Sequence, residues 1–271
     1  MALLPDAADS VRVLDVTGAD YRRAFELFLA GTDEKVRTHE YLNRLVERLP
    51  RRTVFLDVGA GEGGTTGHLA RYFARTVAVE PSAPMREALR RACPTAEIHA
   101  EPVHQLVLDD VQADLALCSH VLYYLPESDW VPLVRRVLTW VSPGGTLVLL
   151  LQAPDNDCMR MVAHFTGARF DLPGLAGALA ERCADLVADT TLDRITNRYR
   201  TTSLADAVQV AEFMLNVPAL AEQRDLPSRQ ALRDYVTSHF TAPDGTVTIN
   251  HAHDILLVHR SGAATTPGSP D

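Results

Sequence analysis

The sequence predicts an α/β fold built around a doubly wound, mainly parallel seven-stranded sheet. From residue 53 onward, short β-rich runs alternate with helix-like segments, a pattern typical of parallel sheets whose two faces are covered by helices. The first run ends in a glycine-rich loop that leads into a helix. Five strand-and-helix units end near residue 152, and two further β-rich runs complete the seven strands.

Two helices are predicted before the first strand, between residues 20 and 49. Apolar side chains recur there at helical spacing, first at Phe25, Phe28 and Leu29 and then from Tyr41 onward. The run Gly31-Thr32-Asp33 separates the two helices.

The strands predicted next are short, and helical patterns separate them. They cover residues 54–58, 76–80, 98–100, 113–120 and 146–152. One helix is expected over residues 65–74, after the glycine loop, and another over residues 128–141. Ser142-Pro143-Gly144-Gly145 ends the second of these helices and turns the chain into the fifth strand.

The second half of the chain is less regular. Helical patterns cover residues 157–166, 173–186, 203–215 and 227–239, and β-rich runs cover residues 188–200 and 246–259. We interpret these elements as cap helices mixed with the edge of the sheet. The predicted organisation is an N-terminal helical segment at 1–50, a main domain at 51–260 with cap helices within about 157–240, and a disordered tail at 261–271.

Composition and charge exclude several classes of function. Hydrophobic residues make up 46% and charged residues 23%, the proportions of a globular enzyme rather than of a disordered or fibrous chain. The formal net charge of -9 repels phosphate backbones and anionic membranes. No apolar stretch approaches the roughly 20 residues needed to cross a bilayer. We therefore expect no nucleic-acid partner and no membrane association.

The cysteines and histidines give no clear metal signature. The four cysteines form no C-x-x-C pair, so we expect small buried hydrophobes in a reducing cytoplasm. The run His251-Ala252-His253 would place two imidazoles on one strand face, but no third ligand is apparent. We predict no metal site.

The glycine loop after the first strand predicts a cofactor site. Asp57 ends the strand, and Gly59, Gly61 and Gly63 allow the backbone to turn sharply and to approach a ligand closely. The loop also satisfies G-x-G-x-x-G through Gly59, Gly61 and Gly64, so a nicotinamide or flavin enzyme stays open. An acid at the end of the next strand, Glu80, suits the ribose of either kind of cofactor.

Further motifs distinguish these alternatives. The stretch Glu80-Pro81-Ser82 and residues 118–125 and 142–149, together with the glycine loop, resemble the signatures of class I S-adenosylmethionine-dependent methyltransferases. The resemblance covers about residues 50–152 and implies a Rossmann-like fold with S-adenosylmethionine as the cofactor. In that family the acid at Asp57 helps to hold the methionine amino group, and the acid at Glu80 binds the ribose. The implied cofactor residues are Asp57, Gly59, Gly61, Gly63, Glu80, Met85, Glu101 (toward the adenine) and Ser119.

The acceptor is expected beyond the carboxyl ends of the strands, where the strand order reverses between the first and fourth strands. Ser119 and His120 end the fourth strand. An imidazole that titrates near neutrality can take a proton from an amine or indole nitrogen. His120 is therefore the candidate catalytic residue, and orientation of the substrate is its alternative role.

The wider chain resembles the histamine N-methyltransferase-like branch of small-molecule methyltransferases. The spacing of Tyr21, Phe25 and Glu34 matches that branch, and its acceptor-binding glutamate falls on Glu34. The branch's fourth-strand glutamine falls on His120, a departure that argues against histamine itself. Its late-strand asparagine falls near Asn250 or His251.

The chain is also similar to actinobacterial methyltransferases that act on indole C3 of tryptophan-derived diketopiperazines. In those enzymes a histidine at this strand end and an N-terminal tyrosine matter, here His120 and Tyr21. The implied catalytic residues are His120 and Tyr21, and the implied substrate-binding residues are Glu34, Tyr21, Phe25, Tyr124 and Asn250.

The predicted function is S-adenosylmethionine-dependent methylation of a small nitrogen-containing molecule, in natural-product tailoring, at nitrogen or at an electron-rich carbon such as indole C3. The alternatives are a histamine-like amine N-methyltransferase, a nicotinamide-dependent oxidoreductase and a non-catalytic methyltransferase-like subunit. A cytoplasmic location is expected. The oligomeric state and the identity of the acceptor stay open.

Overall fold

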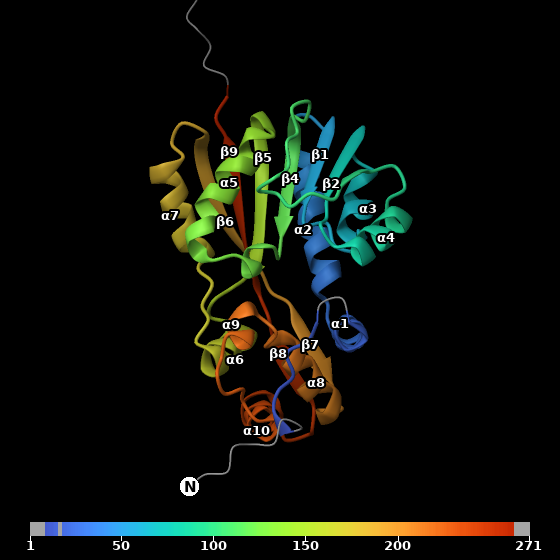
Figure 1. Ribbon diagram of the computed structural model, residues 1–271, viewed down its shortest axis with the longest axis vertical. Helices are drawn as coiled ribbons and strands as arrows, with labels where there is room; N and C mark the ends of the chain where they lie inside the picture. Colours follow the sequence, from blue (N-terminus) through green and yellow to red (C-terminus); the bar gives the residue numbers. More distant parts are fainter. Residues whose placement is uncertain (1–8, 16–17, 263–271) are drawn as a thin grey trace, which may run out of the picture. The chain divides into compact units, whose positions relative to one another are not determined.

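The computed structural model describes residues 9–15 and 18–262 (Figure 1). Its chain divides into two compact units, each built from several segments. The first unit contains the residues up to Tyr41, Leu151–Asp171 and Arg194–Asp254. The second contains Leu42–Leu150, Leu172–Asp193 and the residues from Ile255 onward. Most of the predicted tail, residues 263–271, lies outside the described residues.

A seven-stranded sheet forms the core of the second unit, in the order β3-β2-β1-β4-β5-β9-β6. Strands β1, β2, β3, β4 and β5 pair in parallel. This confirms the predicted fold class. The order reverses beside β1, where β2 and β3 continue on one side and β4 and β5 on the other. The strands are β1 Val54–Val58, β2 Arg75–Val79, β3 Glu97–His99, β4 Ala113–Ser119, β5 Val141–Gln152, β6 Val187–Ile195 and β9 His253–Arg260.

Burial explains why these runs form central strands. Every residue of β1 and the first six of the seven in β4 are buried, so each strand presents apolar side chains to both faces of the sheet. Helices pack beside the sheet, with α3 and α4 near β2 and α5 and α7 toward β6 (Figure 1). They are α3 Gly64–Ala70, α4 Ala83–Ala92, α5 Trp130–Thr139 and α7 Leu172–Arg182.

The segment between β4 and β5 differs from the prediction. The helix expected over residues 128–141 is shorter, because a 3-10 turn at Glu127–Asp129 precedes α5 and Val141 already pairs with Ala113 of β4. The strand register shifts between Ala113 and Leu115, so the Ser-Pro-Gly-Gly run bulges out of β5. Another 3-10 turn, Leu122–Tyr124, follows β4.

The first unit combines helices with a two-stranded antiparallel sheet of β7 and β8. Side chains cap three of its helices at the N-terminus: Asn156 before α6, Ser203 before α8 and Ser228 before α10. Its elements are α1 Ala19–Gly31, the first half of α2 Glu34–Arg48, α6 Asp157–Thr166, β7 Arg198–Thr201, α8 Leu204–Met214, α9 Pro218–Ala221, α10 Arg229–Phe240 and β8 Val247–Asn250. The two N-terminal helices and the break between them lie where the sequence predicts them.

Two long strands predicted from the sequence are each divided. The run 188–200 forms β6 and β7, which belong to different sheets, and the run 246–259 forms β8 and β9 in the same way. The two interruptions lie side by side, because the backbone N–H of His251 donates to the carbonyl of Asn197 at 3.0 Å. A change of sheet leaves the β-rich composition intact, so the sequence pattern does not reveal it.

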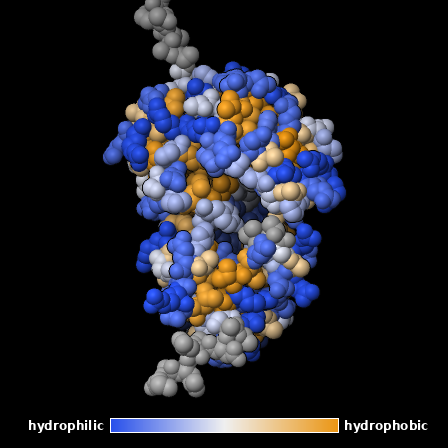
Figure 2. Space-filling view, viewed as in Figure 1, coloured by the Kyte–Doolittle hydropathy of each residue, from blue (hydrophilic) through white to orange (hydrophobic). Residues whose placement is uncertain are grey.

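The surface of the described residues is mixed in character. The face in Figure 2 shows hydrophilic side chains around smaller groups of hydrophobic ones. Large exposed hydrophobic side chains come from separate elements: Val13, Val36, Val107, Tyr124 and Leu192. Within residues 9–15 and 18–262, no helix has the length and apolar character of a membrane span.

Candidate active site

The glycine loop between β1 and α3 has the backbone that the sequence predicts. Gly59, Gly61 and Gly63 have φ of +77°, +56° and +82°, in the left-handed region that favours glycine. A Cβ at Gly63 would meet Leu89 of α4, with Cδ1 at 2.6 Å, whereas a Cβ at Gly61 or Gly64 would meet no atom within 4 Å. Gly64 already belongs to α3 and has no such backbone requirement. The loop therefore uses the glycine spacing that ends at Gly63.

Glu80 fastens this loop to the start of α4. Its Oε2 accepts the backbone N–H of Gly61 at 2.9 Å, and its Oε1 accepts that of Ser82 at 2.7 Å. The side chain is largely buried, and Arg86 donates to its backbone carbonyl at 2.9 Å. A carboxylate oxygen has further acceptor capacity, so both oxygens can also receive hydroxyl groups of a ligand.

Asp57 lies at the opposite end of the loop and orients α3. Its Oδ2 accepts the hydroxyl of Thr66 at 2.6 Å, and both side chains are buried. Burial of Cys118 on the neighbouring strand β4, with a smaller effect of the negative charge of Asp57, raises the pKa of the Cys118 thiol to about 12. Cys118 is therefore a thiol at neutral pH and not a nucleophile.

The other predicted cofactor residues are less tightly defined. Met85 lies half-buried in α4, and Ser119 ends β4, where it pairs with Leu150. Glu101 is exposed in the loop after β3, and its carboxylate accepts the backbone N–H of Ala100 at 3.1 Å. All three assignments stay predictions.

His120 follows β4 in an unusual backbone conformation. Its φ of 59° is the only positive value at a residue other than glycine in the part of the chain that the structure describes. Its N–H donates to the carbonyl of Leu150 at 2.9 Å, which fixes this geometry. The imidazole stacks on Tyr123, with ring centroids 5.7 Å apart, and its Nδ1 lies 3.3 Å from the Tyr123 hydroxyl. Non-glycine residues held in this region concentrate at functional sites.

An aromatic cluster in the first unit contains two of the predicted acceptor residues. Tyr21 and Phe25 of α1 are half-buried and contact Phe213 of α8, with ring centroids 5.2 and 5.8 Å apart. Phe28 continues the cluster to His251 with edge-to-face geometry at 5.2 Å. The cluster ends against a group of buried polar side chains.

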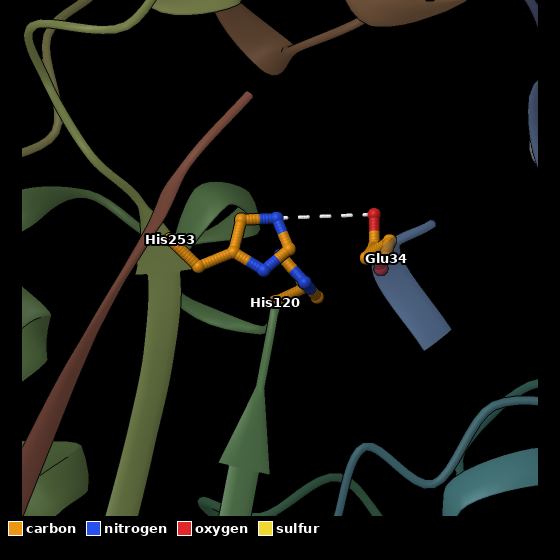
Figure 3. Close-up of side chains that lie close together, drawn as sticks. All are labelled: Glu34, His120 and His253. Carbon is orange, nitrogen blue, oxygen red and sulfur yellow. Dashed lines mark ion pairs between the residues drawn. The ribbon is translucent and has the colours of Figure 1, made fainter. Parts of the chain in front are cut away.

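Glu34, at the start of α2, is the centre of that buried group. Its Oε2 lies 3.8 Å from Nδ1 of His251 and 3.8 Å from Nε2 of His253, the first residue of β9; Figure 3 shows the second pair. The hydroxyl of Thr32 lies 2.8 Å from Nε2 of His251. Burial raises the pKa of Glu34 and lowers the pKa of His251 to about 4, so both groups favour their neutral forms.

This arrangement changes two conclusions from the sequence. His251 and His253 do not share one strand, because His251 lies in the break between β8 and β9. The metal site was set aside for want of a third ligand, and Glu34 supplies a carboxylate near both imidazoles. That reason no longer holds, and the absence of a metal stays a prediction.

Two predicted substrate residues are placed differently from their neighbours. Asn250 is exposed, and its side chain donates to Asp157, whereas the adjacent His251 is buried beside Glu34. Tyr124 is 54% exposed, whereas Tyr123 contacts His120. The physical reason is the same for both: successive side chains along extended or tightly turned backbone point in different directions. The assignments of Asn250 and Tyr124 stay predictions, and the structure adds their neighbours His251 and Tyr123 as candidates.

Comparison with known proteins finds a family model that matches the central region of the chain. Residues 56–149 match the family model described as a methyltransferase domain. This stretch of the chain is similar to methyltransferase domains. The match covers β1 through most of β5, and so contains the glycine loop, Glu80 and His120. It confirms the methyltransferase fold that the motifs predict for this stretch.

Curated relatives of the methyltransferase domain share part of the chain. An uncharacterized methyltransferase of Mycobacterium bovis is 32% identical over 117 residues, 43% of this chain and 46% of that protein. A trans-aconitate 2-methyltransferase of Paracidovorax citrulli is 33% identical over 144 residues, 48% of this chain and 49% of that protein. The chain thus spans about half the length of these relatives.

Solved structures extend the similarity of fold to most of the chain. A structure described as a putative methyltransferase from Bacillus halodurans has a TM-score of 0.54 at 15% identity, covering 91% of this chain and 100% of that one. N-methyltransferase NodS from Bradyrhizobium japonicum, in complex with S-adenosyl-L-homocysteine, has a TM-score of 0.52 at 16% identity, covering 90% and 99%. These similarities concern the fold alone.

Sequence reasoning missed three residues that the structure brings to the candidate sites. Thr66, the third residue after Gly63, looks like an ordinary helix position in the sequence. Tyr123 was one of two adjacent tyrosines, and only the 3-10 turn distinguishes them. His253 was considered only as a possible metal ligand together with His251. Its contact with Glu34 was not foreseen, because the two residues lie 219 positions apart in the sequence.

Proposed function

We propose that this protein is an S-adenosylmethionine-dependent methyltransferase that acts on a small nitrogen-containing molecule. The observation that carries the proposal is the loop from Asp57 to Gly63 with Glu80 fastened across it. No protein atom lies within 4 Å of the position that a Cβ of Gly61 would occupy, so this side of the loop is open. The buried carboxylate of Glu80 accepts the backbone N–H of the same residue. This cradle suits an adenosine ribose and a methionine amino group.

The residues that would hold the cofactor have distinct roles in the proposal. Glu80 receives the ribose hydroxyls, Asp57 attracts the ammonium group, and the left-handed glycines let the backbone come close. S-adenosylmethionine, when bound, supplies a methyl group whose bond to a sulfonium sulfur breaks with the electron pair staying on sulfur. The protein needs no covalent intermediate, and it accelerates the reaction by orienting the partners and excluding water.

His120 is the proposed proton acceptor. It follows β4, next to the reversal of strand order where ligands of open parallel sheets bind. An acceptor nitrogen that gains a methyl group, or an indole that gains one at C3, must lose a proton, and a neutral imidazole can take it. Tyr21, Phe25 and Glu34 are proposed to bind the acceptor, with indole C3 of a tryptophan diketopiperazine as the first choice and histamine-like amines as the second.

The proposed activity is placed in the cytoplasm and in natural-product tailoring. All four cysteines are free and buried, which suits a reducing compartment. The tailoring role rests on the resemblance to indole C3 methyltransferases.

The direct test is mass spectrometry of a panel of acceptors incubated with the purified protein and S-adenosylmethionine. The panel contains tryptophan diketopiperazines, imidazole amines, aromatic amines and trans-aconitate, the last because of the Paracidovorax relative. We expect the mass gain of one methylene on a nitrogen-containing acceptor, unchanged by EDTA. Methylation of trans-aconitate alone would contradict the proposed acceptor class.

A substitution at His120 tests its role. His120→Ala is expected to lower kcat about 100-fold or more, within the range for general base catalysis. The Kd for S-adenosylhomocysteine, measured by calorimetry, is expected to stay within about twofold, because Asp57 and Glu80 are untouched. Equal turnover in the variant would remove His120 from the mechanism. His120→Asn is the control for the backbone, since asparagine tolerates a positive φ.

A further inference from the structure

The backbone around His120 fixes where the imidazole can lie. The N–H of His120 is bonded to Leu150, and the next residue, Val121, packs against the glycine loop, where its Cγ2 would lie 2.3 Å from a Cβ at Gly59. The chain then closes a 3-10 turn, with the N–H of Tyr124 donating to Val121 at 3.1 Å. Residues 120–124 therefore form one tightly packed corner.

Tyr123 contacts the imidazole across this corner. The two rings are nearly parallel, with an interplanar angle of 16°. The hydroxyl of Tyr123 lies 3.3 Å from Nδ1 of His120 and thus addresses one of the two ring nitrogens.

A hydrogen bond at Nδ1 decides what Nε2 can do. If the hydroxyl donates to Nδ1, the imidazole proton resides on Nε2, which is then a donor. If Nδ1–H donates to the hydroxyl oxygen, Nε2 carries the lone pair and can accept a proton. Only the second tautomer makes His120 a base through the nitrogen that faces away from Tyr123.

We propose that Tyr123 is the positioning residue of His120, whose hydroxyl oxygen accepts from Nδ1–H and thereby makes Nε2 the atom that takes the acceptor's proton. The role of His120 as a base rests on the proposed function; the tautomer and the ring orientation do not. During turnover the proton passes from the acceptor to Nε2, Nδ1 keeps its own proton, and the resulting imidazolium releases the added proton to water. Charge and protons balance without another reactant.

The substitution Tyr123→Phe keeps the stacked ring and removes only the hydroxyl. We expect kcat/KM to fall roughly fivefold, the effect of one neutral hydrogen bond. The imidazolium loses its oxygen partner, so the pKa of the base falls and the acid limb of the kcat/KM profile shifts about half a unit to lower pH. The matched control is Tyr72→Phe, because the Tyr72 hydroxyl accepts from the exposed side chain of Arg71 at 3.1 Å and belongs to none of the proposed sites. It is expected to change neither quantity, and both variants keep the wild-type Kd for S-adenosylhomocysteine.

Nitrogen-15 NMR of the His120 imidazole tests the proposal independently of activity. The wild-type ring is expected to show the Nδ1–H tautomer, and Tyr123→Phe is expected to shift the population toward Nε2–H. An Nε2–H tautomer in the wild type would overturn the proposal, even in an active enzyme. The expected tautomer in a protein that methylates no acceptor would uphold the positioning and reject the proposed function instead.

A double substitution tests whether Tyr123 acts through His120. In the His120→Ala background, Tyr123→Phe is expected to lower the residual rate by less than a factor of two, because its partner is already absent. A further fivefold loss in that background would show that Tyr123 acts on the substrate directly, contrary to the proposal.

Discussion

His251 shows how burial sets the charge of a single residue. Its side chain is fully buried among Thr32, Phe28 and Glu34, and loss of solvation lowers its pKa to about 4. In the unfolded chain this imidazole is protonated below about pH 6.5. In the folded protein it stays neutral until about pH 4. The free energy of unfolding therefore falls as the pH falls through this window.

We predict that His251 contributes a loss of about 3 kcal/mol between pH 6.5 and pH 4. The measurement is urea unfolding of the wild type and of His251→Gln at a series of pH values. The quantity compared is the slope of the free energy of unfolding against pH. The variant is expected to lose this part of the pH dependence. Identical slopes for the two proteins would contradict a neutral buried imidazole.

Glu34 changes the free energy of unfolding with pH in the opposite direction to His251. Its raised pKa means that the folded protein holds a proton that the unfolded chain releases, so its contribution to stability is lost as the pH rises above about 4.5. Glu34→Gln mimics the neutral acid, and we expect it to be at least as stable as the wild type at pH 8. It serves as the control that separates the two groups.

The glycines of the loop give a graded prediction. Gly63→Ala is expected to cost about 3 kcal/mol, because it combines a left-handed φ with a clash against Leu89. Gly61→Ala meets no atom and is expected to cost about 1 kcal/mol from backbone strain alone. Gly64→Ala is expected to stay within about 0.5 kcal/mol or to stabilise the helix.

Chemical denaturation of the three variants measures this order. The dinucleotide pattern needs its third glycine at Gly64 for close packing of helix on strand. A loss at Gly64→Ala as large as that at Gly63→Ala would therefore support the dinucleotide reading and contradict the methyltransferase one.

Single residues were predicted where local chemistry defines them. Asp57, Glu80 and His120 each lie within one residue of the end of a strand in a parallel sheet, a position that the sequence pattern reveals. The choice between Asn250 and His251, and between Tyr123 and Tyr124, could not be made from the sequence because it depends on which way a side chain leaves the backbone. Asn250 is adjacent to His251, and Tyr124 is adjacent to Tyr123. Adjacent residues of similar polarity cannot be distinguished by sequence pattern.

At the scale of elements, Glu80 connects β2, the glycine loop and α4. The two carboxylate oxygens of Glu80 accept the backbone N–H groups of Gly61 and Ser82, one each. Glu80→Gln keeps only one side-chain oxygen, so one of these N–H groups loses its acceptor. We predict a loss of about 1 to 2 kcal/mol in unfolding free energy and a Kd for S-adenosylhomocysteine raised at least about tenfold.

Glu97→Gln is the matched control for this prediction. Glu97 lies on β3 and pairs with Arg75 at 2.7 Å, but its side chain is half exposed. An exposed ion pair contributes about 1 kcal/mol or less, and this one is not part of the loop. Equal effects of the two substitutions on the Kd would show that Glu80 has no special place in the cofactor site.

The first four strands were predicted to within one residue at each end because each is short, apolar and bounded by polar turns, whereas β5 begins five residues earlier than predicted. The later strands were not, since β6 and β7, like β8 and β9, are consecutive β-rich runs that belong to different sheets. Local composition reports that a segment is extended but not which sheet it joins. Pairing partners far along the chain decide that.

At the scale of the whole molecule, the sequence pattern predicts the N-terminal helices and the later cap helices as separate parts of the chain. The structure places α1 in one unit with α6, α8, α9 and α10, whereas α7 belongs to the other unit. In the first unit α1 packs on α8, and Arg12 binds the buried Glu212 at 2.8 Å. Arg229 of α10 lies 3.3 Å from the same carboxylate. Charges about 200 residues apart leave no trace in local periodicity, which explains why this grouping was not foreseen.

The central claim is that the loop from Asp57 to Gly63, with Glu80, binds S-adenosylmethionine. The most direct measurement is thermal unfolding of the protein with S-adenosylhomocysteine or with NADH, each at about 100 times a micromolar Kd. A ligand bound only to the folded state stabilises it by about 2.7 kcal/mol at that excess, which corresponds to a rise in Tm of about 5 to 10 °C. We predict that rise with S-adenosylhomocysteine and none with NADH. A rise with NADH and none with S-adenosylhomocysteine would contradict the account.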